Sequence, residues 1–135
     1  MNLKPFRKAF GNKEFTEVQK VILYYKKNKI DPPYNGIFEK KLSKRFSKYM
    51  NGGYSKAVAT GTSASFVAIQ SLQLNKNSEI LVSAVNDSGP FNSIVALGLK
   101  PKLIDSSKKN YNTNLEEIKK RISKNTKACL IAHIG

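Results

Sequence analysis

The sequence lacks the features of a membrane, secreted or disulfide-bonded protein. Its 135 residues contain no apolar run that approaches the roughly 20 residues needed to cross a bilayer. The first residues lack the apolar core of a secretion signal. The single cysteine, Cys129, cannot form a disulfide within the chain. We therefore expect a cytoplasmic protein without membrane partners.

Acidic residues are also scarce, because 9 Asp and Glu stand against 24 Lys and Arg and give a formal net charge of +15. The excess is +10 in residues 1–56 and +5 in residues 57–135. Such a charge is found in nucleic-acid-binding proteins, whose lysines neutralise phosphates. Here the lysines are scattered in pairs, which favours solvated surfaces. We expect no nucleic-acid partner, and a basic nucleic-acid-binding domain is the alternative from another class.

The length suits one domain, and 40% hydrophobic residues indicate a globular chain. Residues 1–12 are expected to form an extended arm, broken by Pro5. Apolar residues recur at helical spacing over 13–28 and again over 37–50, and a loop rich in proline and glycine separates these predicted helices. The sequence contains no internal repeat.

After residue 56 the pattern changes to short apolar runs separated by helix-compatible segments. The predicted strands are 57–59, 80–84, 103–104 and 128–132. The predicted helices of this part include 65–74 and 114–122, the second with an Asn114 cap and with Leu115, Ile118 and Ile122 facing inward. Apolar strands without polar alternation, joined by helices, predict an α/β fold: a mostly parallel sheet with helices on both faces.

The segment ATGTSAS, residues 59–65, lies between a predicted strand and a predicted helix. Such a turn presents backbone N–H groups and the positive end of a helix dipole to an anion. Hydroxyls of Thr60, Thr62 and Ser63 lie at the same place. A phosphate-bearing ligand is one interpretation. The other is that Thr62 or Ser63 only caps the helix.

Six motifs follow one another in the order and spacing of a known family. They are GNKEFTEV (11–18), GIFE (36–39), AVATGTSA (57–64), GLKPKLID (98–105), YN (111–112) and SKNTKACLIAHIG (123–135). Together they resemble the DegT/DnrJ/EryC1/StrS family, the nucleotide-sugar aminotransferases of fold type I that depend on pyridoxal 5'-phosphate (PLP). No single motif is specific, but the set is.

The resemblance implies that residues 59–65 hold the phosphate of PLP. Gly61 lets the backbone approach the phosphate, while Thr62 and Ser63 donate hydrogen bonds. Asn86 and Asp87 lie where most members have Thr and an aromatic residue that stacks on the cofactor ring. They are expected to form one wall of the ring pocket, although an aspartate provides no π face.

Two alternatives are open at this departure from the family pattern. A small shift could bring Phe91 against the ring, or residues 86–90 could be only a turn. His133 is expected at the carboxyl end of a strand, where open α/β sheets bind ligands. A lone histidine there is more often structural than catalytic, and we assign it a structural role.

The resemblance implies an enzyme that transfers an amino group, usually from glutamate, to a nucleotide-linked keto-sugar in cell-surface polysaccharide or related sugar biosynthesis. The expected partners are a nucleotide-sugar, an amino-acid donor and, at full length, a second copy in a homodimer. A PLP-dependent sugar dehydratase of the same family, with histidine in place of the lysine, is the alternative. A non-catalytic binding module is another.

In the family, the lysine that binds the cofactor covalently and the aspartate that pairs with its ring follow the motif that ends here at Gly135. We therefore expect an incomplete aminotransferase large domain, truncated after the fourth predicted strand and inactive alone. Residues 1–35 would form an arm and helix, and 36–135 the first part of the cofactor-binding domain. We assign no catalytic residue and no metal ligand.

Overall fold

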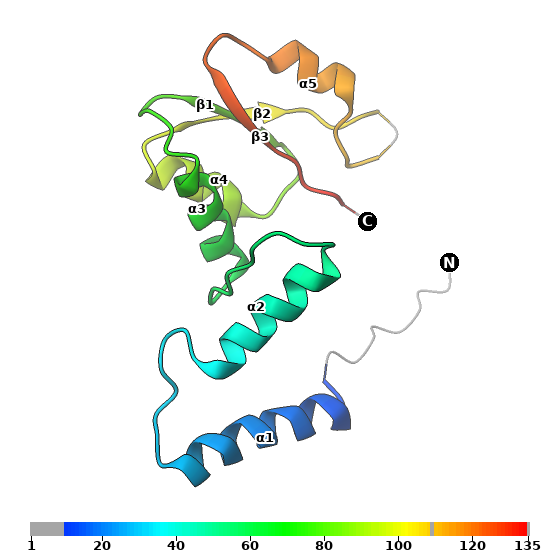
Figure 1. Ribbon diagram of the computed structural model, residues 1–135. Helices are drawn as coiled ribbons and strands as arrows, with labels where there is room; N and C mark the ends of the chain where they lie inside the picture. Colours follow the sequence, from blue (N-terminus) through cyan, green and yellow to red (C-terminus); the bar gives the residue numbers. More distant parts are fainter. Residues whose placement is uncertain (1–9, 109, 135) are drawn as a thin grey trace, which may run out of the picture. The chain divides into compact units, whose positions relative to one another are not determined.

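The computed structural model describes residues 10–108 and 110–134 (Figure 1). The chain divides into two compact units between Ala57 and Val58. The boundary expected between residues 35 and 36 lies inside the first unit, in the loop between its two helices. No helix of the described residues is long and apolar enough to cross a membrane.

The first unit consists of two helices, α1 (Asn12–Asn28) and α2 (Ile37–Tyr49). The Glu14 carboxylate accepts from the backbone N–H of Gly11 at 2.8 Å, which satisfies a donor just before α1. Lys29 ends α1 in the left-handed conformation, at a φ of 52°. Most of the 1–12 arm, residues 1–9, lies outside the described residues.

Aromatic side chains join the two helices of this unit. The ring of Phe38 lies 5.3 Å from the ring of Tyr24 and 5.7 Å from that of Tyr25, both in edge-on geometry. Yet no side chain of either helix is buried. Leu42 of α2 remains 57% exposed, so the apolar stripe that predicts the helix does not face a core within this unit.

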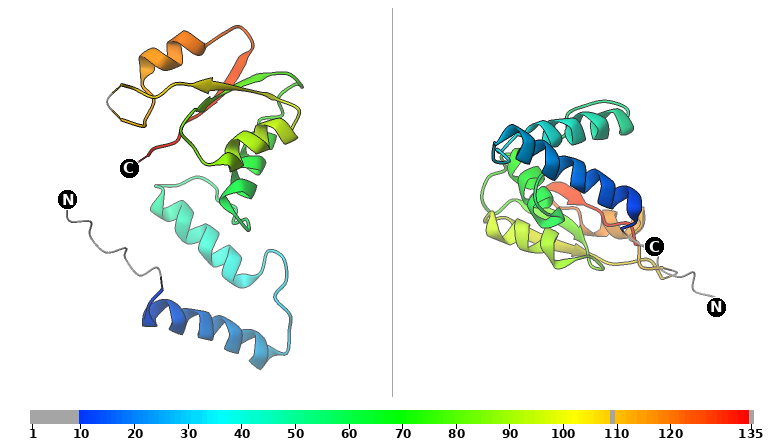
Figure 2. Two further views of the ribbon diagram at one scale, coloured as in Figure 1. Left: turned by 180° about the vertical axis from the view of Figure 1, so that it is seen from behind. Right: turned by 90° about the horizontal axis from the view of Figure 1, so that it is seen from below.

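The second unit is a three-stranded parallel sheet with helices on both faces (Figures 1 and 2). Its elements in chain order are α3 (Gly61–Ser71), β1 (Glu79–Ser83), α4 (Ser88–Ala96), β2 (Lys100–Ile104), α5 (Leu115–Arg121) and β3 (Thr126–Leu130). The strand order is β2-β1-β3. Helices α3 and α4 cover one face, and α5 covers the other. The α/β prediction is confirmed.

The core of this unit lies on both sides of the central strand β1. Ile80 and Val82 pack with Ile69 of α3 and Ile94 of α4. Alternation along the strand turns Leu81 to the opposite face, and Leu81 is fully buried. A strand buried on both faces explains the apolar run without alternation in the sequence.

Several predicted elements differ from the structure, and the strands predicted at 103–104 and 128–132 are observed at Lys100–Ile104 and Thr126–Leu130. The predicted strand 57–59 is wrong, because these residues are in no strand and lack a neighbouring strand to pair with among the described residues. The helix predicted over 65–74 begins earlier, at Gly61. Leu115 of α5 and Ile122, the residue that caps its end, are more than half exposed instead of facing inward, and of the three predicted inward residues only Ile118 is partly buried.

Candidate functional site

The three strands are parallel, so their carboxyl ends lie at one edge of the sheet. Asn86 follows β1, Asp105 follows β2 and His133 follows β3 at this edge. Helix α4 begins here, directly after Asn86 and Asp87. Open α/β sheets bind ligands at this edge, so a ligand site is expected there.

The first turn of α3 presents unpaired backbone donors. Thr60 is the N-cap, and its Oγ1 accepts from the N–H of Ser63 at 3.0 Å. Its carbonyl accepts from the N–H of Ala64 at 3.0 Å. The N–H groups of Gly61 and Thr62 have no acceptor within the helix, because the first N–H groups of any helix lack one. These two donors can bind an anion.

Thr60 thus performs the capping role that the sequence left open between Thr62 and Ser63. Thr60 Oγ1 also donates to Ser63 Oγ at 3.0 Å, so the Ser63 hydroxyl already has a partner. Thr62 Oγ1 has no hydrogen-bond partner among the described residues. Of the two hydroxyls predicted to bind the phosphate, that of Thr62 is the more available.

Neither the backbone conformation nor the packing at position 61 requires glycine. Its φ lies outside the left-handed region, and a Cβ added there would have no atom within 4 Å. The side chain that glycine lacks would project into open space beside the two backbone donors. This open side leaves room for a phosphate against the backbone, so the geometry fits the predicted group.

The start of α4 differs from that of α3, because an acidic side chain of the protein caps it. Asp87 is its N-cap, and Oδ1 of its carboxylate accepts from the N–H of Gly89 at 2.8 Å. Its negative charge already lies at the positive end of this helix. The first turn of α3 contains no acidic residue. Electrostatics therefore favour an anion at α3 over α4.

Asn86 adds a buried donor without a partner. Its Oδ1 accepts from the N–H of Asp87 at 2.8 Å. Its Nδ2 is buried and has no hydrogen-bond acceptor among residues 10–108 and 110–134. An unpaired buried amide of this kind costs about 1–3 kcal/mol, which a ligand oxygen could recover. This orphaned donor is a second observation that fits a bound cofactor.

The five residues predicted to bind the cofactor belong to two helix starts: Gly61, Thr62 and Ser63 to α3, and Asn86 and Asp87 to the segment that leads into α4. The two helix starts are in contact at Gly89. A Cβ added to this glycine would lie 2.5 Å from Thr62 Oγ1. Phe91 lies further along the first turns of α4 and is 39% exposed.

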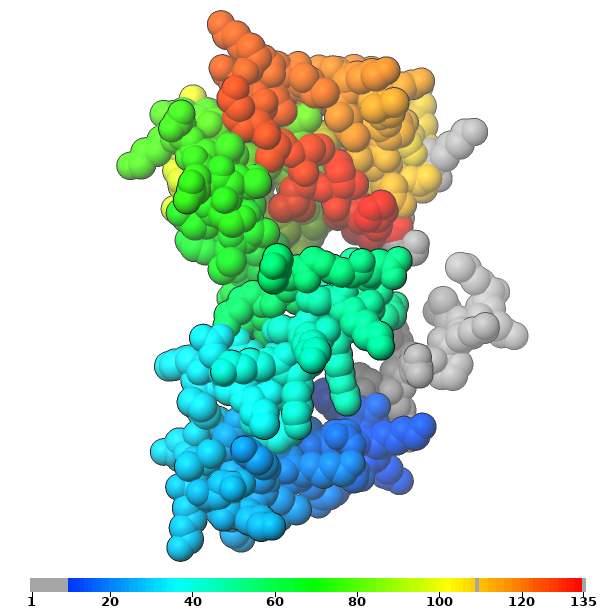
Figure 3. Space-filling model, viewed as in Figure 1, coloured from blue at the N-terminus to red at the C-terminus, as the bar shows by residue number. Residues whose placement is uncertain are grey.

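A second group of polar residues lies at the same sheet edge. Asn112 donates from Nδ2 to the Ile134 carbonyl at 2.9 Å and accepts from the Ile134 N–H at 2.6 Å. Figure 3 shows this C-terminal segment, in red, beside the loop before α5. His133 is exposed, and Thr113 Oγ1 is buried without a partner. Among the described residues, no cluster of His, Cys, Asp or Glu could hold a metal.

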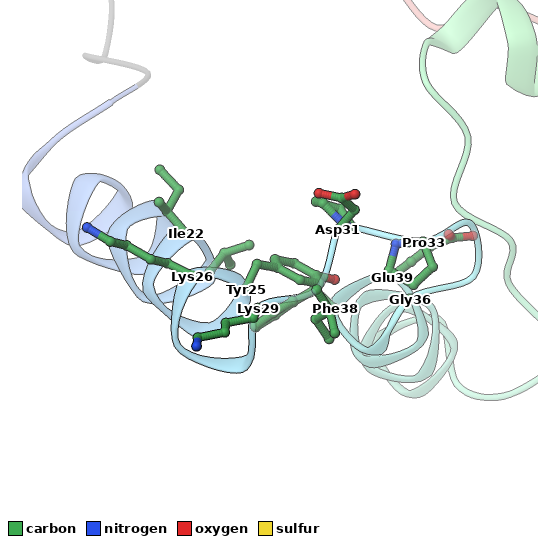
Figure 4. A pocket seen from close by; sticks show the side chains of 12 residues that line it. Ile22, Tyr25, Lys26, Lys29, Asp31, Pro33, Gly36, Phe38 and Glu39 are labelled. Atoms are coloured by element: carbon green, nitrogen blue, oxygen red, sulfur yellow. The ribbon is translucent and has the colours of Figure 1, made fainter.

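Hollows occur both beside the start of α3 and away from it. One of about 480 Å³ lies between α3 and α4, where Phe66 and Val67 line it together with Thr62. A larger one of about 730 Å³ lies in the first unit, between α1, α2 and their loop. In Figure 4, Tyr25 and Phe38 lie side by side in the larger hollow. None of the predicted cofactor residues lines the larger hollow.

Gly89 and Ser93 were not predicted as site residues. They lie one turn apart on α4, at a spacing that places them on the same face of the helix. The sequence does contain a signal for this helix: Asp87 followed by Pro90 indicates a helix start at Ser88 rather than a turn. The contact between Gly89 and Thr62 could not be predicted from spacing.

A protein-family model described as the DegT/DnrJ/EryC1/StrS aminotransferase family matches residues 13–135. A GDP-4-keto-6-deoxy-D-mannose 3-dehydratase from Yersinia pseudotuberculosis is 29% identical over 70% of this chain and 26% of its own length. A 3-oxo-glucose-6-phosphate:glutamate aminotransferase from Bacillus subtilis is 29% identical over 76% of this chain and 22% of its own length.

Among solved structures, an E. coli GDP-4-keto-6-deoxy-D-mannose-3-dehydratase with bound hydrated PLP matches with a TM-score of 0.79 at 25% identity. The match covers 93% of this chain and 32% of the dehydratase. The chain therefore spans a third or less of the length of these three relatives.

Proposed function

Because the chain belongs to the DegT/DnrJ/EryC1/StrS aminotransferase family, we propose that it binds PLP as the N-terminal part of an enzyme acting on keto-sugars. The chain is related to PLP-dependent enzymes of sugar metabolism, which include both aminotransferases and a dehydratase. The proposed reaction is transfer of an amino group, from glutamate as donor, to a keto-sugar linked to a nucleotide.

The single observation that supports the proposal most is the start of α3. The N–H groups of Gly61 and Thr62 would bind the phosphate, with the Thr62 hydroxyl as a third donor. The dipole of an eleven-residue helix adds a favourable field, and no acidic side chain in the first turn opposes it. Ser63 would support the phosphate through its hydrogen bond to Thr60.

Asn86 and Asp87 are proposed to form a polar wall of the ring pocket. The unpaired Nδ2 of Asn86 would donate a hydrogen bond to the cofactor. Asp87 keeps one carboxylate oxygen on the N–H of Gly89 and would present its charge to the ring. When bound, PLP supplies an electron-withdrawing ring and a reactive aldehyde, and this chain supplies binding and orientation.

We propose that the contribution of this chain to the PLP site is non-covalent and includes the five residues named for cofactor binding. The family resemblance assigns covalent attachment to none of the lysines of this sequence. For the chain alone we therefore predict reversible PLP binding without covalent attachment. Borohydride reduction that fixes the cofactor stoichiometrically to one particular lysine of the chain would contradict this assignment, whereas low labelling spread over many exposed lysines would not.

Gly61→Ala tests the phosphate site, because its effects on binding and stability have opposite signs. Alanine is compatible with this φ, so we expect the free energy of unfolding to rise by about 0.4–1 kcal/mol. The added methyl group would occupy the open side of the turn, so the dissociation constant for PLP is expected to rise at least tenfold. Urea unfolding and equilibrium titration measure the two effects.

The matched control is Gly11→Ala, at a glycine of ordinary φ outside the unit that contains α3. It should leave PLP binding unchanged. Pyridoxal, which lacks the phosphate, should bind the unaltered chain far more weakly than PLP. Equal affinity for pyridoxal and PLP would contradict the proposed phosphate site.

A sugar dehydratase is the second candidate, because two of the three relatives described above are dehydratases. Nitrogen-labelled glutamate separates the two reactions in the protein that contains this chain. Labelled nitrogen in the sugar product indicates amino transfer, and a deoxygenated sugar without label indicates dehydration. We also propose a homodimer at full length, and light scattering that gives a monomeric mass would contradict it.

A further inference from the structure

Gly89 lies in the first turn of α4 and is buried. Its φ lies outside the left-handed region, so the backbone conformation accepts any residue. The packing around position 89 does not accept a side chain, since a Cβ would lie 2.5 Å from Oγ1 and 3.2 Å from Cβ of Thr62. Cβ atoms in real proteins do not approach neighbours to 2.5 Å. The next closest atom is Asp87 Oδ1 at 3.1 Å, so the shortest of these contacts, to Thr62 Oγ1, leaves no room for a side chain at position 89 unless Thr62 moves.

Ser93 reinforces this contact one turn further along α4. Its side chain is 3% exposed, and its Oγ donates to the Gly89 carbonyl at 2.8 Å. The same Oγ lies 3.4 Å from the Thr62 carbonyl. Asp87 holds the other side of Gly89 through the hydrogen bond to its N–H. Gly89 is thus fixed from both sides, directly against Thr62.

We propose that Gly89 is a positioning residue that sets the orientation of the Thr62 hydroxyl. An inference of this kind rests on the proposed PLP site, because Thr62 is placed there as a phosphate donor. Thr62 has two ways to avoid a side chain at position 89: rotation about χ1 or displacement of the first turn of α3. Either movement takes the hydroxyl from its present direction. The phosphate turn and the Asn86–Asp87 wall are therefore held in one arrangement by this contact.

The first experiment measures the contact without any ligand. The full chain is compared with Gly89→Ala, Thr62→Ala and the double variant by urea unfolding. We expect Gly89→Ala to lower the unfolding midpoint of the unaltered chain and to lower that of the Thr62→Ala variant much less. Such non-additivity identifies a direct contact. Equal shifts in both backgrounds would overturn the proposal.

The second experiment measures phosphate recognition as the ratio of PLP affinity to pyridoxal affinity. Gly89→Ala should reduce this ratio at least tenfold, because only PLP uses the Thr62 hydroxyl. When it is added to the Thr62→Ala variant, the same substitution should leave the ratio unchanged. Ser88→Ala, an exposed neighbour in the same turn, is the matched control and should preserve the ratio. A merely structural defect would weaken both ligands equally.

The outcomes separate this inference from the proposed function. If the unaltered chain binds PLP and pyridoxal equally, the proposed PLP site is wrong and the positioning role falls with it. If the unaltered chain prefers PLP and Gly89→Ala keeps that preference, only the positioning role is wrong. If Gly89→Ala alone does not fold, a folded double variant supports the contact. An unfolded double variant contradicts it.

Discussion

Single polar side chains connect segments that are distant in the sequence. Asn112, in the loop before α5, hydrogen-bonds both backbone groups of Ile134 after β3. Its amide provides one donor and one acceptor, and the peptide groups of Ile134 require both. Asn112 therefore fixes the segment after β3 at the carboxyl edge of the sheet, together with Ser83, whose Oγ accepts from the N–H of Ala132 at 3.1 Å.

Replacement of Asn112 by alanine removes both hydrogen bonds. Each contributes about 0.5–1.5 kcal/mol, so we expect the free energy of unfolding to fall by about 1–3 kcal/mol. Amide exchange at Ile134 should accelerate. Asn28→Ala is the control, because Asn28 is exposed and makes one local bond to the Tyr24 carbonyl. An equal loss of stability in both variants would contradict the assignment of Asn112 as a link between the loop before α5 and Ile134.

At the scale of the elements, the amino edge of the sheet contains a polar network. The Glu79 carboxylate, at the start of β1, accepts from Ser123 Oγ at 2.6 Å and lies 3.4 Å from Lys102 Nζ. These two donors connect β1 to β2 and to the turn before β3. The Ser123 hydroxyl, followed by Lys102, holds the pKa of Glu79 below its ordinary value of 4.5, against the opposing effect of burial.

A lowered folded-state pKa means that ionised Glu79 stabilises the fold above pH 4.5, and that this stabilisation disappears as the pH falls through the folded-state pKa. We expect Glu79→Gln to be less stable than the unaltered chain at neutral pH, with a difference that shrinks in acid. Ser123→Ala should remove much of that pH dependence. Urea unfolding at several pH values measures it, and a constant difference at every pH would refute it.

At the scale of the whole molecule, the two units differ in how they bury apolar side chains. The second unit has a core in which Ile80, Leu81 and Ile94 are 1% exposed or less. The helices of the first unit contain no buried residue. The stability of the two units should therefore depend on different kinds of residue. The central strand β1 should be the element most protected from amide exchange.

The same leucine-to-alanine change at one position in each unit tests this difference in burial. Leu81→Ala should cost about 2–5 kcal/mol, because it leaves a cavity in a closed core. Leu42→Ala, at a side chain that is 57% exposed, should cost about 0.5 kcal/mol or less. Urea unfolding of each variant gives both values. A cost at Leu42 as large as at Leu81 would show that the apolar face of α2 is covered in solution.

The sequence alone determined the features that depend on local periodicity and capping. Helical spacing located α1 and α2, and Asn114 located the start of α5. Apolar runs without alternation indicated a parallel sheet, because a strand covered on both faces has no solvent side. The small residues and the position of the turn at Gly61 left two interpretations, an anion site or a simple helix cap, and the anion site stays a proposal.

Only the tertiary structure decided which groups at that turn have partners. Thr60 caps α3, and the Thr62 hydroxyl has no partner in the described part of the chain. Asp87 caps α4, so the start of α4 already holds a negative charge. The strand expected at 57–59 failed because pairing requires a neighbour that no local pattern supplies. The contact between Gly89 and Thr62 likewise joins two helices distant in the sequence. Local patterns fix the dihedral preferences of a segment, but packing fixes what each segment touches.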